Sequence, residues 1–193
     1  MKQIFLLSPA NCSGVRADWL FRKNSSLELA KRLRGQGVPL SEVFSFLSAL
    51  YFRGKLAYAQ AFARPPGAGA GIFIITANLG LVPHDMLIRT AKLRAFKRTA
   101  IGVTSRVYCT SLRRSARQLV GDMGPQCTVV LLGSITSGKY LKPLAPIFGH
   151  RLRVPAEFIG RGDMSRGGLL LRCVKDQREL TYIDAGKIAS RQR

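Results

Sequence analysis

Acidic residues are scarce in this 193-residue chain: ten Asp and Glu stand against 31 Lys and Arg, so the formal net charge is +21 and the pI is near 11.1. A surface of this charge repels itself unless counterions or an anionic partner are near, and nucleic acid is the commonest such partner. An anionic membrane, an acidic protein and an arginine-favouring codon bias are the alternatives. The composition therefore indicates a polyanion-binding protein without indicating a reaction.

Histidines and paired cysteines are also lacking. Only His84 and His150 are present, and the four cysteines lie far apart with no C-x-x-C pair. This pattern excludes the usual zinc motifs and a disulfide framework, so we expect no metal, no cofactor and a reducing, cytoplasmic compartment. No apolar run reaches the roughly 18 residues that span a bilayer. Ser8 and Pro9 end the first apolar run too early for a signal peptide, so we expect no membrane association.

Apolar residues are plentiful enough for a core, at 47% of the chain. Continuous apolar and β-branched runs within residues 2–7, 72–76 and 128–132 are typical of strands buried on both faces. Helical patterns separate these runs, and this alternation is typical of α/β proteins. The sequence therefore predicts an α/β fold, a single three-layer sandwich with a mostly parallel sheet over residues 1–185, followed by a basic flexible tail at residues 186–193.

Several helices are expected from capping and periodicity. Ser25 and Glu28 have the spacing of a capping box, for a helix that ends at Gly35. Residues 39–62 carry apolar side chains at intervals of three, four and seven, and we expect Gly54 to divide this segment into two helices. The remaining expected helices are residues 104–120, 137–148 and 165–174.

Three polar loops follow expected strands, at residues 8–16, 78–85 and 133–140. Ligands of open α/β sheets bind at the carboxyl ends of the strands, so we expect these loops to form one site. Ser8, Asn11 and Asn78 are the candidate binding residues of the first two loops. The alternative is that every strand-to-helix loop is polar and rich in turns whether or not it binds anything.

The third loop fits the pattern G-x-x-x-x-G-K, from Gly133 to Lys139. Tyr140 stands where a nucleotide-hydrolysing phosphate loop requires Ser or Thr, because that hydroxyl holds Mg²⁺. We therefore expect no ATPase site. Lys139 and the backbone amides of the loop are instead predicted to hold a phosphate of another ligand.

The densest polar segment, residues 160–168, reads Gly-Arg-Gly-Asp-Met-Ser-Arg-Gly-Gly. Its four glycines allow a ligand to approach the backbone closely. We expect Arg161 and Arg166 to bind phosphates and Asp163 to be catalytic, as a base, a stabiliser of positive charge or a hydrogen-bond acceptor. The alternative is a salt bridge at the start of the next helix.

Residues 86–121 contain no acid and nine bases: Arg89, Lys92, Arg94, Lys97, Arg98, Arg106, Arg113, Arg114 and Arg117. Such a segment indicates a polyanion footprint, although many charged runs are only solvated surface. Arg113, Arg114 and Arg117 lie on the polar side of an expected helix, and we predict that they bind nucleic-acid phosphates. Bases and aromatics also alternate within residues 51–58, which predicts either a base-stacking platform or a part of the core.

Four segments carry resemblances, at residues 4–14, 42–58, 129–135 and 160–172. Together, over most of the chain, they resemble an uncharacterised bacterial family of small proteins that carries the Gly-Arg-Gly-Asp-Met-Ser-Arg-Gly-Gly-Leu-Leu-Leu-Arg segment. More distantly, the first strand with Leu-Leu-Ser-Pro-Ala is similar to the peroxide-stress DNA-binding family. Ile-Thr-Ala-Asn-Leu-Gly-Leu-Val-Pro, followed by Val-Val-Leu-Leu-Gly-Ser, resembles a domain of modified-guanine tRNA enzymes that is related in shape to uracil-DNA glycosylases. These resemblances imply an α/β sandwich that handles nucleosides or nucleic acid. The water-activating motif of the glycosylases is not recognisable, so no catalytic residue is carried over.

Taken together, these features predict a nucleic-acid-binding protein, for DNA or RNA, whose chemistry on nucleosides would be glycosylase- or ribosyl-transfer-like. In that chemistry Asp163 would position water or stabilise an oxocarbenium ion, and Asn78 would read the edge of a flipped base. Two alternatives stay open: a non-enzymatic DNA-binding stress protein, and an enzyme that binds a small nucleotide. The sequence does not decide whether the chain is an enzyme.

Overall fold

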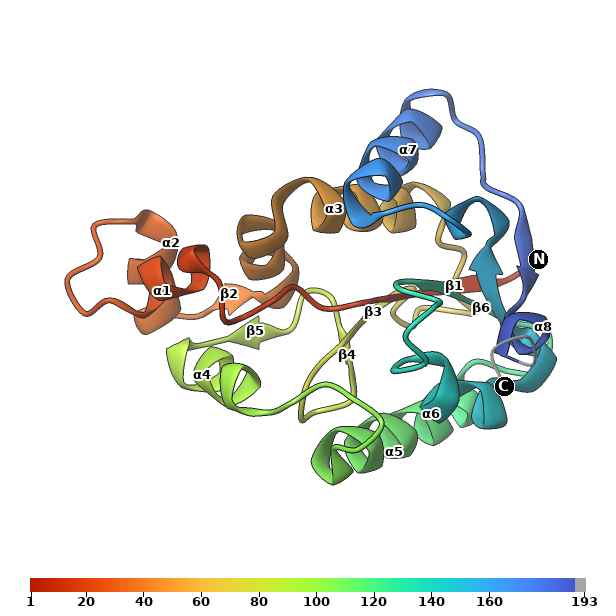
Figure 1. The fold of residues 1–193 in the computed structure, drawn as a ribbon, viewed down its shortest axis with the longest axis horizontal. Coiled ribbons are helices and arrows are strands. Elements are labelled where there is room, and N and C mark those ends of the chain that lie inside the picture. Colours follow the sequence, from red (N-terminus) through yellow and green to blue (C-terminus); the bar gives the residue numbers. More distant parts are fainter. Residues whose placement is uncertain (190–193) are drawn as a thin grey trace.

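One six-stranded sheet forms the centre of the molecule in the computed structural model, which describes residues 1–189 (Figure 1). Its strands stand in the order β4-β3-β1-β6-β7-β8. The four inner strands are parallel, and each edge strand is antiparallel to its neighbour. The strands are β1 (Gln3–Leu7), β3 (Ile72–Ile75), β4 (Leu81–Pro83), β6 (Thr128–Leu132), β7 (Leu152–Pro155) and β8 (Tyr182–Asp184). The α/β class and the mostly parallel sheet are confirmed.

Strand β1 occupies the middle because it has no polar side to expose. All five of its residues are buried. It pairs with β6 from Gln3 opposite Thr128 to Leu7 opposite Leu132, and with β3 on its other edge. Parallel strands covered on both faces are apolar throughout, and this explains why continuous runs located the strands correctly.

Helices cover both faces of the sheet. Figure 1 shows α3 (Leu40–Phe62) and α7 (Asp163–Lys175) on one face, with α5 (Arg106–Asp122) and α6 (Leu141–Phe148) on the other. In α5 the buried residues include Leu112, Ala116 and Leu119, whose spacing of four and three places them on one side of a helix. The short helices η1 (Gly149–Arg151) and η2 (Ala156–Phe158) flank β7, and α8 (Ala185–Ala189) follows β8.

A small group of elements lies at the end of the molecule toward which β1 runs (Figure 1). It contains α1 (Val15–Phe21), α2 (Glu28–Arg34), α4 (Thr90–Arg98) and a two-stranded sheet of β2 (Val38–Pro39) and β5 (Leu87–Ile88). Lys97 of α4 forms an ion pair with Asp18 of α1 at 2.9 Å, and Arg94 donates to the carbonyl of Phe21. The carboxyl ends of the strands therefore face helices rich in basic residues.

Helix α3 bends at Ala49, not at Gly54, where we expected two separate helices. Ala49 has φ 44° and ψ −116°, a positive φ that is uncommon for a residue with a Cβ. Gly54 continues the helix because it meets α7 there: a Cβ on Gly54 would lie 2.7 Å from the carbonyl oxygen of Gly167. The glycine thus allows two helices to approach closely and does not end one.

Other expectations about helix ends were wrong. The capping box of Ser25 and Glu28 does not form, because α2 begins after Leu27 with no side-chain cap. The helix expected from Ser165 begins earlier, with Gly162 as its N-cap. Part of the expected tail forms α8, and residues 190–193 lie outside the described residues. Within residues 1–189, no helix combines the length and the apolar character needed to cross a membrane.

The close approach of α3 and α7 generates a first prediction. We expect Gly54→Ala to destabilise the protein by about 1–3 kcal/mol, because the added methyl group overpacks against the backbone of α7. As a control, Gly121→Ala places a Cβ in open space on α5 and should be neutral or stabilising by up to about 1 kcal/mol. Urea unfolding measures both. Equal unfolding midpoints for Gly54→Ala and the wild type would contradict the close approach.

Candidate functional site

The carboxyl ends of β1 and β6 form the topological switch point of the sheet. From β1 the chain crosses to β3 through α3 on one face, whereas from β6 it crosses to β7 through α6 on the other (Figure 1). Open α/β sheets bind their ligands at the point where loops leave the sheet in opposite directions. The polar side chains gathered there are called the switch-point cluster: Ser8, Tyr51, Lys55, Lys139, Tyr140, Asp163 and Arg166.

Lys55 is the buried centre of the cluster. Its side chain comes from α3 with 1% of the residue exposed. The Nζ donates to the carbonyl oxygen of Ser8 at 2.6 Å and to the Ser8 hydroxyl at 2.7 Å, and it lies 4.4 Å from the centre of the Tyr51 ring. Within residues 1–189 it forms no ion pair with a carboxylate. Burial lowers the pKa of Lys55 from 10.5 to about 7; the charge of Asp163 opposes this shift and that of Lys139 adds to it. A substantial fraction of this amine is therefore neutral near pH 7.

Two buried tyrosines flank the amine. The pKa of Tyr51 is raised to about 12, chiefly by burial and also by the negative charge of Asp163, while Arg166 opposes the shift. Burial also raises the pKa of Tyr140, with contributions from Tyr51 and Asp163. Both phenols therefore stay protonated at neutral pH. The Tyr51 hydroxyl and the Nε of Arg166 are both buried, and a hydrogen bond from the Arg166 side chain is among the contributions that lower the pKa of Tyr51.

The first turn of α7 brings the acid and the arginine of the cluster. Arg166 is 5% exposed and donates to the carbonyl of Phe158 at 2.9 Å. Its other terminal nitrogen lies 3.4 Å from a carboxylate oxygen of Asp163, whose side chain is 67% exposed. Asp163 is thus not enclosed in a pocket. It forms the salt bridge of the alternative interpretation, while its charge still acts on Lys55, Tyr51 and Tyr140.

The loop between β6 and α6 contributes Lys139 and Tyr140. A Cβ on Gly133 would lie 2.9 Å from the Cβ of Ser8 and 3.3 Å from the Tyr140 ring, so only glycine lets this loop close over the end of β1. The Nζ of Lys139 lies 5.1 Å from the centre of the Tyr140 ring. Lys139 is half-buried beside Tyr140, so part of its side chain can contact an anion. Of the residues that the sequence singled out, the structure brings together Ser8, Lys139, Asp163 and Arg166.

The other loop residues lie elsewhere. Asn11 is exposed, accepts a hydrogen bond from the amide of Ser13 at 2.9 Å, and lines a separate hollow of about 250 Å³ against α4. The Oδ1 of Asn78 is buried without a partner among the described residues. Arg161 is exposed and donates to the Ser165 hydroxyl. The expectation that all three loops share one site is thus met only for the loops after β1 and β6.

The acid-free segment is largely at the surface. Eight of its nine basic residues are exposed, including Arg113, Arg114 and Arg117 on α5. Among the described residues, only Lys97 of this segment forms an ion pair. By contrast, the stacking platform expected within residues 51–58 is wrong. Tyr51, Phe52 and Tyr58 are at most 6% exposed, so they belong to the core alternative.

Sequence reasoning missed Lys55, Tyr51 and Tyr140 as site residues. One signal could have found Lys55: it lies four residues after Tyr51 and three before Tyr58, on the apolar side of a helix. A lysine on the apolar side of a helix is either buried with its neighbours or interrupts the apolar spacing. For Tyr140, no sequence signal distinguishes a buried phenol at the switch point from a loop residue.

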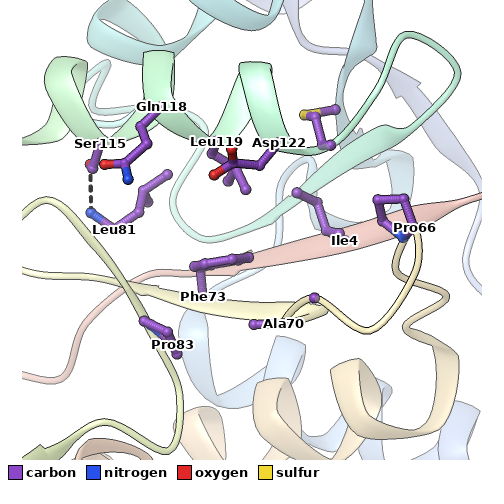
Figure 2. A pocket seen from close by; sticks show the side chains of 12 residues that line it. Ile4, Pro66, Ala70, Phe73, Leu81, Pro83, Ser115, Gln118, Leu119 and Asp122 are labelled. Atoms are coloured by element: carbon purple, nitrogen blue, oxygen red, sulfur yellow. Dashed lines mark hydrogen bonds between the residues drawn. The ribbon is translucent and has the colours of Figure 1, made fainter.

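Another pocket, of about 310 Å³, lies far from the switch point between α5 and the edge of the sheet. Figure 2 shows Ile4, Phe73 and Leu81 facing Leu119 and Asp122. The amide of Leu81 donates to the Ser115 hydroxyl at 2.8 Å and closes one end of this pocket. It is mainly apolar and contains none of the predicted site residues.

The chemistry of the switch-point cluster follows from its donors and acceptors. Lys139 and Arg166 supply positive charge for a phosphate, the Lys55 amine can accept a proton near neutral pH, and Asp163 offers a carboxylate at the rim. Within residues 1–189, no group of three or more His, Cys, Asp and Glu side chains is placed to hold a metal ion. The cluster thus suits acid–base chemistry on an anionic ligand.

The buried Lys55 predicts a pH dependence of stability. Between pH 10.5 and about 7 the unfolded chain binds a proton at Lys55 that the folded chain does not. Stability therefore rises as the pH rises through this range, by up to about 1.4 kcal/mol per pH unit. Lys55→Met should remove this part of the slope, whereas Lys175→Met, at an exposed site, should keep it. Urea unfolding at a series of pH values tests this, and identical slopes for Lys55→Met and wild type would refute it.

Comparison with known proteins assigns neither a family nor a function to the chain. No family model matches the chain, and neither does any curated protein or any solved structure. The resemblances noted in the sequence therefore remain predictions, and the function is argued from the residues themselves.

Proposed function

We propose that this chain binds nucleic acid through the exposed bases of residues 86–121 and acts on a nucleotide at the switch-point cluster. The observation that carries the binding proposal is the exposure of those bases without acidic partners. Among the described residues, eight of the nine are exposed and one forms an ion pair. A nucleic acid that binds such unpaired surface cations releases its condensed counterions, and this release favours binding.

The exposed arginines of α5 favour nucleic acid over other polyanions as the partner. Arg113, Arg114 and Arg117 lie exposed along α5, one helical turn apart or adjacent. A guanidinium pairs with phosphate through two parallel hydrogen bonds and also stacks on bases, which a lysine ammonium cannot do. The proposal therefore includes DNA and RNA, with affinity governed by the phosphate backbone and little preference for sequence.

The switch-point cluster supports chemistry on a nucleoside. Lys139 and Arg166 would hold a phosphate, and the exposed carboxylate of Asp163 would position water or stabilise positive charge that develops on the sugar. Asn78 lies outside this cluster, and its buried Oδ1 would accept a hydrogen bond from a base edge only if a ligand reached that loop as well. Binding of a phosphate and stabilisation of charge on the sugar are the two functions of a glycosylase- or ribosyl-transfer-like reaction that the cluster itself supports.

We infer further that the helices on both sides of the sheet form a single three-layer sandwich and that the protein works in a reducing, cytoplasmic environment. The cysteines support the second inference. Cys12, Cys109, Cys127 and Cys173 are all free and buried. Burial raises the pKa of Cys12 to about 12, so this thiol stays protonated and unreactive.

One alternative rests on the enclosure of the site. Lys55 and Ser8 are at most 4% exposed, which suits a small free nucleotide better than a base within a polymer. An enzyme acting on such a nucleotide would bind it without binding a polynucleotide. The other alternative, a non-enzymatic DNA-binding stress protein, would need only the exposed bases.

Nucleic-acid binding should depend steeply on salt. If about six phosphates are neutralised, the affinity should fall about a thousandfold between about 50 and 200 mM salt. Reversal of Arg113, Arg114 and Arg117 to Glu should weaken binding because it removes three cations and adds three anions at the contact. Filter binding at several salt concentrations measures both effects.

A control separates a local contact from net charge. Reversal of Arg172, Lys175 and Arg178 to Glu changes the net charge by the same amount, but these exposed residues lie in and just after α7. Their reversal should weaken binding much less. If wild-type protein retains no nucleic acid on the filter at low salt, the binding proposal is wrong. If both triple variants lose the same affinity, the assignment of the contact to α5 is wrong.

The reaction has its own test. Wild-type protein incubated with DNA or RNA should release bases and leave abasic sites, which an aldehyde-reactive probe counts. Asp163→Asn should abolish this release while salt-dependent binding persists, because the side chain keeps its size and loses its charge. Binding without any abasic site would favour the non-enzymatic alternative, and binding of a free nucleotide alone would favour the small-molecule enzyme.

A further inference from the structure

Trp19 is the single tryptophan of the chain, and it lies half-exposed on α1 with 39% of its surface accessible. It lines an open hollow of about 360 Å³ between α1 and α3, together with Arg16, Ser45, Phe46, Ala49 and Arg53. This volume is at the lower end of the range for small-ligand pockets, which is about 300–1,000 Å³. No function assigned above uses this hollow, which is called the Trp19 hollow.

The Trp19 hollow combines aromatic surface with positive charge. A terminal nitrogen of Arg16 donates to the carbonyl of Phe46 at 3.0 Å, which holds the guanidinium at the rim. Arg53 also lines the hollow and is exposed, and neither arginine forms an ion pair within residues 1–189. No acidic residue lines the hollow. A ligand that fits it therefore has a flat apolar part and carries negative charge.

An unpaired nucleotide has both properties. Every base offers a face that stacks on an aromatic ring, and the phosphates on either side of it pair with arginine. A base inside a duplex is stacked on its neighbours and hidden, so only a single strand can present its face. We propose that the Trp19 hollow stacks one unpaired base of a single-stranded nucleic acid, with Arg16 and Arg53 binding the adjoining phosphates. This inference rests on the proposed nucleic-acid binding and adds to it a preference for single strands.

The kink of α3 connects this hollow to the switch-point cluster. Ala49, with its positive φ, forms part of the wall of the hollow, and Tyr51 of the cluster follows two residues later. Arg53 and Lys55 lie two residues apart on α3 and point to different surroundings. Arg53 is exposed, whereas Lys55 is buried. A strand held at Trp19 is thereby placed beside the helix that carries the centre of the cluster.

Because the chain has one tryptophan, its fluorescence reports on this hollow alone. We expect a short oligothymidylate to quench the fluorescence of the wild-type protein at low salt. An abasic oligonucleotide of the same length keeps the phosphates and lacks the bases, so it should bind without comparable quenching. A blunt duplex should quench less than the single strand at equal phosphate concentration.

Two substitutions test the energetic role. Trp19→Ala should weaken binding of the single strand about tenfold, as expected for loss of one base–aromatic stack. Leu171→Ala removes an apolar side chain with a similar exposure of 37% on α7 and should leave affinity unchanged. If Trp19→Ala shows no cooperative thermal unfolding by circular dichroism, Trp19→Phe takes its place in the test. This variant keeps an aromatic ring, so its affinity for the single strand should fall less than tenfold.

The outcomes separate the two proposals. Filter retention with equal quenching by the abasic and the natural oligonucleotide, or unchanged affinity of the folded Trp19 variants, overturns the stacking site and leaves the proposed function standing. Absence of retention of any nucleic acid at low salt overturns the proposed function itself. Base-dependent quenching together with the selective loss in Trp19→Ala supports both.

Discussion

The crossing of α3 and α7 at Gly54 and Gly167 is the contact on which the arrangement of the switch-point cluster depends. A Cβ on Gly167 would lie 3.0 Å from the Cα of Tyr51, so the two backbones meet with no side chain between them. This approach places the first turn of α7 directly over Tyr51 and Lys55. Arg166 is buried there as a consequence, and it remains hydrogen-bonded because the carbonyl of Phe158 accepts from it. Larger residues at the crossing would move the acid and the arginine away from the amine together.

Electrostatics inside the cluster favour an anionic ligand. Lys139, Arg166 and the protonated form of Lys55 carry positive charge around a single exposed carboxylate, and the repulsion between the two lysines contributes to the lowered pKa of Lys55. An anion bound at the rim would raise that pKa by stabilising the ammonium form. If an anion binds at the cluster, its binding and proton uptake by Lys55 are therefore linked.

The sequence predicted three central parallel strands, but not the edge strand β4, which lies inside the loop expected at residues 78–85. It predicted the site only in part. Strands such as residues 128–132 could be recognised because burial on both faces leaves no polar position, and the loop after them was placed correctly as a consequence. Lys55 was not singled out because a lysine in a basic chain is ordinarily a surface residue. Its burial depends on α7, which comes more than a hundred residues later. Trp19 was overlooked for a similar reason: its exposure is decided by how α1 packs on α3. The bend at Ala49 is likewise a product of tertiary packing, since alanine is a strong helix former.

The short antiparallel edge strands affect how copies of this basic protein behave when they are crowded together. A polyanion concentrates many copies of a basic protein along its length, and open sheet edges at such concentrations pair with one another. Here β4 and β8 contain three residues each. Exposed Pro83 at the end of β4 has no amide hydrogen to donate to a neighbouring strand. Copies brought together at high concentration are thus poorly placed to extend each other's sheets into fibrils.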